Sequence, residues 1–177
     1  GQQRLGLPLP PRLARLVIEA AKVGDQDRAS LAAALLTERS PFAEEHPQPK
    51  LATRWPCDLL DRIMRLQRFR DGDSSAVSSP IAARQILQVA AQINRSVEKS
   101  TTSTTPAADE SFQRALLAAY PDRVARLRPS SQDRGVMVGG RGVKLDRSSV
   151  CRGAAFFLCL DVDSAGTEAL VRIASAI

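Results

Sequence analysis

The chain has 177 residues, of which 44% are hydrophobic and 25% are charged. This composition fits one ordinary globular domain or two small ones, and it argues against a disordered chain. Lys and Arg outnumber Asp and Glu by 25 to 19, so the net charge favours a polyanionic partner, although a GC-rich genome that encodes arginine at solvated positions explains it equally well.

A helical hairpin is predicted at the start of the chain. After Pro10 and Pro11, apolar side chains recur at helical spacing on one face: Leu13, Leu16, Val17, Ala20 and Ala21. Gly24 can adopt the left-handed conformation that ends a helix, and Asp25 is a favourable N-cap. A second, Ala/Leu-rich helix is therefore expected over about 26–37, antiparallel to the first.

Two further helices are expected after a proline-rich loop over 40–56. The third helix, about 57–69, has one apolar face: Leu59, Leu60, Ile63 and Leu66. A Gly/Ser stretch over 71–79 ends it, and Pro80 suits the first position of a fourth helix. The expected buried side of that helix consists of Ile81, Ile86, Leu87, Ala90 and Ile93.

Residues 98–111 are rich in Ser and Thr and are predicted to be a linker, because they cannot bury a core. A fifth helix is expected over 112–120, and Pro121 is expected to restart it as a short helical turn through Arg128. The low aromatic content of 4% also favours helices over large antiparallel sheets for much of the chain.

Beyond Pro129 the hydrophobic period changes to that of β-strands. Residues 136–145 predict a β-hairpin that turns at Gly139 and Gly140, where glycine tolerates positive φ. Strands over 154–162 and 168–177 follow. Because the sequence stops inside this sheet, we expect a partial antiparallel β-barrel and a chain that was cut from a longer polypeptide.

The expected fold class is therefore α+β. Its predicted domains are a helical bundle over 1–97, the linker over 98–111, a bridging helix over 112–128 and the partial barrel over 129–177.

Motifs for catalysis are absent from the sequence. It contains no GxxxxGK[ST] loop for nucleotide phosphates, and the glycines at 139–142 are expected to join two strands. Asp109 and Glu110 are interpreted as the charges that favour a helix N-terminus. His46 is the one histidine, which leaves no basis for a Ser-His-Asp triad. No catalytic or cofactor-binding residue is predicted.

The cysteines do not form a metal-binding motif. Cys57, Cys151 and Cys159 include no CxxC pair, so the donor spacing of a zinc site is missing. Their odd number fits a reducing compartment, and Cys159 is expected in the core because it lies in an apolar run. That run, 154–160, is too short to span a bilayer, and no signal peptide is visible. The expected location is the cytoplasm.

Several segments resemble the region that follows the motor domains of DEAH/DExH-box helicases. Residues 7–15 (LPLPPRLAR) and 31–41 (LAAALLTERSP) look like the two helices of the helicase-associated, ratchet-like region. Residues 119–128 (AYPDRVARLR) resemble a segment of HrpB-type bacterial ATP-dependent RNA helicases, and residues 57–62 (CDLLDR) fit a helix between these segments. The final strands resemble the oligonucleotide-binding fold that follows.

The resemblance implies an accessory region without ATPase residues of its own. Its expected partners are single-stranded RNA or DNA and the RecA-like motor domains of the same polypeptide, with no membrane. ATP and Mg²⁺ are expected in those motor domains, whose Walker loop and DExH box this sequence lacks. The parent protein would then be an ATP-dependent helicase, whereas the chain itself would not be an enzyme.

The nucleic-acid-binding residues predicted first are Arg123, Arg126 and Arg128, followed by Arg141 and Lys144 on the hairpin. Arg123 and Arg126 would share a face if their segment is helical. An alternative for Arg123 is an ion pair with a carboxylate such as Asp122 that locks the helix to the barrel. For Arg126 and Arg128 the alternative is plain solvation.

Two other functions remain open at this point. The chain could be a docking module that packs on helicase motor domains without contacting nucleic acid. It could also be a free-standing, arginine-rich nucleic-acid-binding protein unrelated to helicases.

Overall fold

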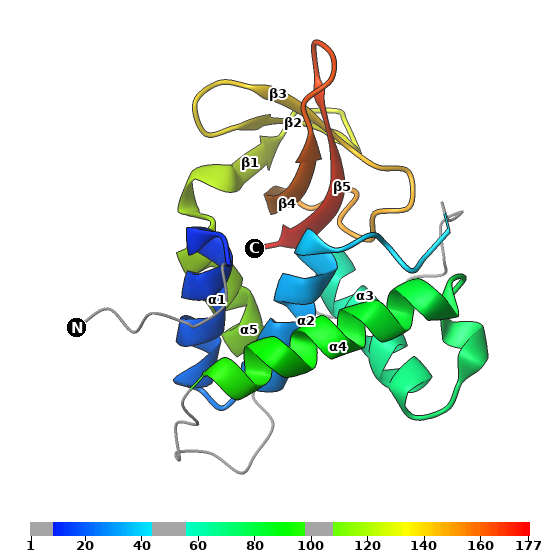
Figure 1. Cartoon of the computed structure of the whole chain (residues 1–177). Helices are drawn as coiled ribbons and strands as arrows, with labels where there is room; N and C mark the ends of the chain where they lie inside the picture. Colours follow the sequence, from blue (N-terminus) through cyan, green and yellow to red (C-terminus); the bar gives the residue numbers. More distant parts are fainter. Residues whose placement is uncertain (1–8, 44–55, 98–107) are drawn as a thin grey trace. The chain divides into compact units, whose positions relative to one another are not determined.

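The computed structural model describes residues 9–43, 56–97 and 108–177 (Figure 1). Within these residues the chain forms two compact units. One unit, here called the helical unit, comprises 9–43, 63–97 and 108–119. The other, the barrel unit, comprises 56–62 and 120–177. The predicted loop over 40–56 and the predicted linker over 98–111 fall largely outside the described residues.

The helical unit contains α1 (Pro11–Ala21), α2 (Gln26–Thr37), most of α3 (Asp58–Arg70), the short 3₁₀ helix η1 (Ser74–Ala76), α4 (Pro80–Ser96) and α5 (Asp109–Ala119). Helix α2 packs against α4, and α1 packs against both α2 and α5. The fully buried large side chains at these contacts include Leu16, Leu31, Ile86, Ile93 and Leu116. No helix of the described chain is both long and apolar enough to cross a membrane.

The predicted α1–α2 hairpin is confirmed. Gly24 has a φ of +75° between the two helices, which is the left-handed conformation that glycine adopts at low cost. Asp25 occupies the N-cap position of α2, but its side chain makes no capping hydrogen bond. Both of its carboxylate oxygens accept hydrogen bonds from Arg28 instead, each at 2.7 Å.

Two details of the predicted helices are wrong. Ile81 was expected on the buried side of α4, yet its side chain is 80% exposed. Residues 109–111 were assigned to the linker, yet they form the first turn of α5. The interpretation of Asp109 and Glu110 as helix N-terminal charges is confirmed by the same turn, where carboxylates face unpaired backbone N–H groups.

The barrel unit contains β1 (Val124–Leu127), β2 (Arg134–Met137), β3 (Gly142–Leu145), β4 (Phe156–Asp163) and β5 (Ala169–Ala176). The strands are hydrogen-bonded in the order β1-β2-β3-β5-β4 and close into a barrel. All neighbouring pairs are antiparallel except β3 and β5, which are parallel. The α+β class, with helices before a barrel, is confirmed, and the predicted hairpin corresponds to β2 and β3.

The expected partial antiparallel barrel is instead closed and contains one parallel pair, β3 with β5, and the closure depends on strand β1. Its residues were predicted as a helical turn, but Pro121 begins only the 3₁₀ turn η2 (Pro121–Arg123), and the chain is extended from Val124. A proline-started turn followed by a β-branched residue favours this outcome. Strand β1 pairs with both β2 and β4 and so closes the barrel.

The barrel encloses its own hydrophobic core. The core side chains come from β1, β3, β4, β5 and the loop before β4, and Met137 of β2 packs against them: Ala125, Val143, Leu145, Cys151, Phe157, Cys159, Ala169, Val171, Ala174 and Ala176. Cys159 is completely buried there, as predicted. Because side chains alternate along a strand, the neighbours of these residues project from the outer face of the barrel.

Candidate nucleic-acid interface

A row of outward-facing residues crosses four neighbouring strands of the barrel, β4, β1, β2 and β3. Arg126 of β1 lies opposite Phe156 of β4 on one side and Val136 of β2 on the other. Val136 lies in turn opposite Gly142 of β3. Residues directly opposite each other on paired strands have their Cβ atoms about 4.5–5.5 Å apart. Phe156, Arg126, Val136 and Gly142 therefore form one continuous surface, the cross-strand row.

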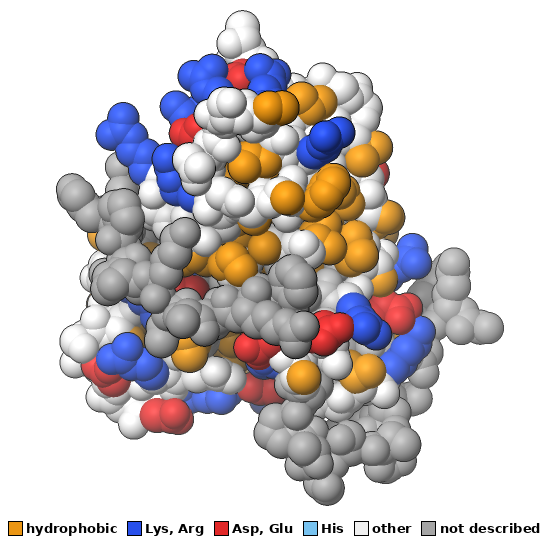
Figure 2. Space-filling view, turned by 180° about the vertical axis from the view of Figure 1, so that it is seen from behind, with side chains coloured by type: hydrophobic (Ala, Val, Ile, Leu, Met, Phe, Trp, Pro, Cys, Tyr) orange, Lys and Arg blue, Asp and Glu red, His pale blue; other side chains and the backbone are white. Residues whose placement is uncertain are grey.

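Apolar side chains in this part of the barrel are unusually accessible. Phe156 is 49% exposed, Val136 38% and the adjacent Val138 58%. Figure 2 shows hydrophobic side chains gathered on one face of the barrel unit, with Lys or Arg side chains among them. A gathering of exposed apolar groups marks a site of interaction more often than an isolated one does.

Arg126 lies at the centre of the row and is exposed. No described carboxylate lies within ion-pair distance of its guanidinium. A guanidinium without an internal partner is available to bind a phosphate or to stack on a base. Arg126 is therefore the predicted residue whose position in the fold suits nucleic-acid contact best.

A second group of cations lies next to the row. Arg134 of β2 pairs directly with Lys144 of β3, so two like charges project side by side from the outer face. Glu168 is 3.2 Å from the guanidinium of Arg134 and 4.0 Å from that of Arg128. These four residues are called the basic cluster; it contains three cations and one carboxylate, which pairs with the two arginines.

Gly142 lets the basic cluster reach the cross-strand row. A Cβ atom at this position would lie 3.4 Å from Nη2 of Arg128 and 3.5 Å from Cγ of Glu168. These two side chains therefore extend over Gly142, in the space that a larger residue would fill. Since Gly142 is the last residue of the row, the row and the cluster form one surface.

The two remaining predicted residues lie elsewhere. Arg141 is exposed in the turn between β2 and β3, where its guanidinium donates a hydrogen bond to the backbone oxygen of Ser164 over 3.4 Å. Arg123 is half-buried in η2. Burial raises the pKa of the Cys159 thiol to about 12, and the charge of Arg123 opposes that rise.

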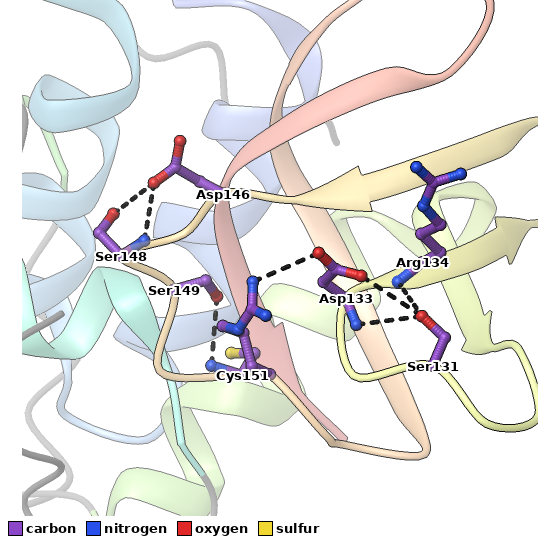
Figure 3. Close-up of polar contacts among 8 residues, drawn as sticks. Ser131, Asp133, Arg134, Asp146, Ser148, Ser149 and Cys151 are labelled. Carbon is purple, nitrogen blue, oxygen red and sulfur yellow. Dashed lines mark hydrogen bonds and ion pairs between the residues drawn. The ribbon is translucent and has the colours of Figure 1, made fainter. Parts of the chain in front are cut away.

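Two loops that hold the strands in register are stabilised by short-range polar contacts (Figure 3). Oγ of Ser131 accepts hydrogen bonds from the backbone N–H groups of Asp133 (3.3 Å) and Arg134 (2.9 Å). Oδ1 of Asp146 accepts from the backbone N–H of Ser148 at 2.9 Å and from its hydroxyl at 2.6 Å. Hydroxyl and carboxylate caps of this kind stabilise turns, so the start of β2, which carries Arg134, is well defined.

A buried carboxylate joins the start of α3 to the barrel. Oδ1 of Asp58 accepts a hydrogen bond from the backbone N–H of Val150 at 2.7 Å. Its Oδ2 accepts one from the hydroxyl of Ser149 and one from the backbone N–H of Ala174, both at 2.8 Å. Burial raises the pKa of Asp58 to about 6, while the hydrogen bonds act in the opposite direction. Each of the three partners belongs to the barrel unit, so Asp58 holds the fold together.

The buried cysteines do not provide a reactive thiol. Burial raises the pKa of Cys57 to about 11 and that of Cys151 well above its usual range. Thiols of this kind are protonated at neutral pH and are weak nucleophiles. Among the described residues, His, Cys, Asp and Glu side chains form no group of three or more that could hold a metal ion.

Arginines of the helical unit are engaged in structural contacts. The guanidinium of Arg28 pairs with Asp25 at 2.7 Å and with Asp109 at 2.6 Å. That of Arg65 lies over the ring of Phe42, 4.2 Å from its centroid. These contacts link α2 to α5 and α3 to the segment after α2, so they stabilise the unit's own packing.

The structure thus brings together three of the five predicted residues, namely Arg126, Arg128 and Lys144. Sequence reasoning missed Arg134, Val136 and Phe156. The doublet Phe156-Phe157 carried a usable signal, because two adjacent residues of a strand face opposite sides. One of the two rings therefore had to face outward, although the sequence alone did not indicate which one.

Comparison with known proteins shows a likeness of fold. The chain resembles the crystal structure of the E. coli DExH-box NTPase HrpB, with a TM-score of 0.58 and 20% sequence identity over 93% of this chain and 17% of that chain. It also resembles the crystal structure of the Escherichia coli DEAH/RHA helicase HrpB, with a TM-score of 0.51 and 19% identity over 92% of this chain and 18% of that chain.

The chain spans less than a fifth of the length of either solved chain. No protein-family model and no curated protein matches the sequence. The predicted resemblance to HrpB-type helicases is confirmed in the fold, along nearly the whole chain.

Proposed function

We propose that this chain is an accessory region of an ATP-dependent RNA helicase and that its barrel contributes to the channel for single-stranded nucleic acid. The basic cluster together with Arg126 is the observation that carries the proposal, because this outer face brings together four cations and one carboxylate, Glu168, which pairs with two of them. Surfaces that hold single strands without reading their sequence combine such cations with stacking side chains.

ATP hydrolysis is assigned to the remainder of such a helicase and not to these residues. A phosphate-binding loop needs glycines that lead from a strand into a helix, so that backbone N–H groups at the helix N-terminus face the phosphates. The glycines at 139–142 instead join β2 to β3 in a hairpin. These glycines therefore do not form a loop that could hold the phosphates of a nucleoside triphosphate.

A second candidate function is that of a docking module, which packs on helicase motor domains and does not touch nucleic acid. The exposed Phe156, Val136 and Val138 favour it, because apolar groups exposed on a barrel surface suit a protein contact as well. The two functions lead to different expectations for oligonucleotide binding: only the first requires binding at low salt that weakens as salt is added.

Fluorescence anisotropy with a labelled twelve-nucleotide oligouridine tests the proposal. Each phosphate neutralised by a cation lowers the slope of log K against log salt by about 0.7 for a single strand. We expect binding at about 50 mM salt that weakens steeply by 200 mM. An absence of binding at the lowest salt concentration would contradict the proposal and favour the docking module.

Two charge-removing variants identify the binding face. Arg126→Ala and Arg128→Ala should each weaken binding to all sequences similarly. Each should also make the slope of log K against log salt less negative by about 0.7. Arg172→Ala is the matched control, because this exposed arginine of β5 is paired with Asp163 at 2.7 Å and lies outside the basic cluster. If the control weakens binding as much as the other two variants do, the effect comes from net charge and not from this face.

A further inference from the structure

We propose that Phe156 is a stacking surface for an unpaired base, and that Arg126 holds the same strand beside it. The inference rests on the proposed function and deepens it. It adds an aromatic contact, made by a residue that the sequence did not single out, to the cationic contacts. The predicted ligand is a single-stranded oligonucleotide whose bases are accessible.

The exposure of Phe156 has no explanation in the barrel itself. Phe112, Tyr120 and Phe157 are buried in the two units, and the ring of Phe42 is covered by Arg65. Among the aromatic side chains of the described residues, Phe156 alone is classed as exposed. An exposed phenylalanine leaves apolar area in water at a cost of roughly 25 cal/mol per Å², so a surface that covers the ring in the bound state is expected.

The backbone beneath Phe156 is held on both sides. Phe156 pairs with Arg126 of β1, its carbonyl accepts a hydrogen bond from Ile177 at 3.2 Å, and the carbonyl of Ala155 accepts one from Leu127 at 2.9 Å. The adjoining Phe157 is fully buried in the barrel core. The ring of Phe156 therefore projects from a rigid strand, which reduces the entropy lost when a base binds.

The charges around Phe156 favour nucleic acid over a protein surface. Arg126, its neighbour in the row, has no carboxylate partner among the described residues. The row itself contains no acidic residue, and it continues at Gly142 into the basic cluster. A phenyl ring and a guanidinium plane are both surfaces on which bases stack. A purely apolar partner would leave Arg126 buried and unpaired, which is costly.

The test separates base stacking from phosphate binding by using two probes with the same backbone. Anisotropy is measured with a twelve-nucleotide oligouridine and with an abasic oligonucleotide of equal length. Phe156→Ala should weaken binding of oligouridine about ten-fold, because stacking on an aromatic side chain contributes about 1–3 kcal/mol per base. Binding of the abasic strand should be unchanged. Ile81→Ala, which removes an 80% exposed apolar side chain of the helical unit, is the control and should alter neither affinity.

Conservative variants establish that the ring itself is required. Phe156→Tyr should retain the affinity for oligouridine, whereas Phe156→Leu, which keeps an apolar side chain but no π-face, should lose most of it. Equal binding by the tyrosine and leucine variants would overturn base stacking, because an apolar side chain without a π-face would then serve equally well. Equal weakening for both probes would also overturn it, since the ring would then only support the barrel. Thermal unfolding of each variant verifies that the fold is intact.

The result also distinguishes this inference from the proposed function. If the unaltered chain binds both probes and Phe156→Ala binds them equally well, only the inference fails. If the unaltered chain binds neither probe at low salt, the proposed function fails and the inference fails with it.

Discussion

At Asp58, burial and hydrogen bonding act on one carboxylate in opposite directions. Three donors of the barrel unit surround it, and Arg62 adds a favourable charge, yet burial still raises its pKa to about 6. The segment CDLLDR was recognised in the sequence as a resemblance to a helicase helix. Only the fold reveals that its first aspartate holds that helix to strand β5 and to the loop before β4.

A dependence of stability on pH follows from this carboxylate. Because the folded-state pKa of about 6 lies above the ordinary value of 3.8, the folded chain takes up a proton before the unfolded chain does. The contribution of Asp58 to stability should therefore rise by up to about 3 kcal/mol as the pH falls from 7 to about 4. Urea unfolding of the unaltered chain and of Asp58→Asn at both pH values measures it.

The variant provides the reference, because an asparagine side chain does not titrate. On acidification, the free energy of unfolding of the unaltered chain should increase relative to that of Asp58→Asn. A shift in the other direction would mean that the three hydrogen bonds, and not burial, dominate the pKa of Asp58.

Gly135 is required by close packing inside the barrel. A Cβ atom at this position would lie 2.8 Å from the backbone oxygen of Arg126 and 3.0 Å from the ring of Phe157. Since a backbone oxygen within a paired strand cannot move aside, we expect Gly135→Ala to reduce the free energy of unfolding by about 1–3 kcal/mol. Denaturant unfolding checks this value.

Gly142 is the matched control for that substitution. It lies on the paired strand β3, but the atoms nearest to its would-be Cβ belong to the side chains of Arg128 and Glu168, which can move. Gly142→Ala should therefore change stability by less than about 0.5 kcal/mol. Similar losses at both glycines would contradict the packing argument.

At the scale of elements, the spacing of hydrophobic residues, together with the prolines and glycines that begin or end helices, predicted the helices well. Prolines at residues 11 and 80 occupy the first positions of α1 and α4, where their missing N–H group has no cost. Strand β1 was missed because it has only four residues, too few to reveal a period of two. Arg123 of η2 and Arg126 of β1 were interpreted as residues of one helical turn, so their positions relative to each other were not predictable.

The end of helix α3 is a feature of this scale that can be tested. The backbone N–H of Asp73 bonds to the carbonyl of Arg68 at 3.0 Å, and that of Gly72 to the carbonyl of Phe69 at 3.1 Å. This pair of bonds is a Schellman motif, which needs a positive φ at the residue after the C-cap. Gly72 has a φ of +109°, and no atom lies within 4 Å of its would-be Cβ.

Gly72→Ala should therefore reduce stability by about 1–2 kcal/mol through backbone strain alone. Gly72→Asn is the control and should cost less, because asparagine tolerates positive φ better than alanine does. Thermal or denaturant unfolding compares the variants. Equal stability of all three proteins would show that the end of α3 rearranges without strain.

At the scale of the whole molecule, the composition, the spacing of hydrophobic residues and the positions of proline and glycine determined a large part of the fold. The sequence by itself determined the α+β class, four of the helix starts, the hairpin of β2 and β3, the basic character and the absence of a phosphate-binding loop. These features depend on local spacing, which a linear pattern carries completely.

Only the tertiary structure decided the closure of the barrel, the parallel pairing of β3 with β5 and the surface that contains Phe156, Arg126 and the basic cluster. Strand register places side by side residues that are up to 30 positions apart in the row, and no local pattern specifies that register. Whether an arginine lies beside a carboxylate or remains available to a ligand depends on the same pairing. The candidate site is for this reason a property of the folded barrel, although its individual cations were visible in the sequence.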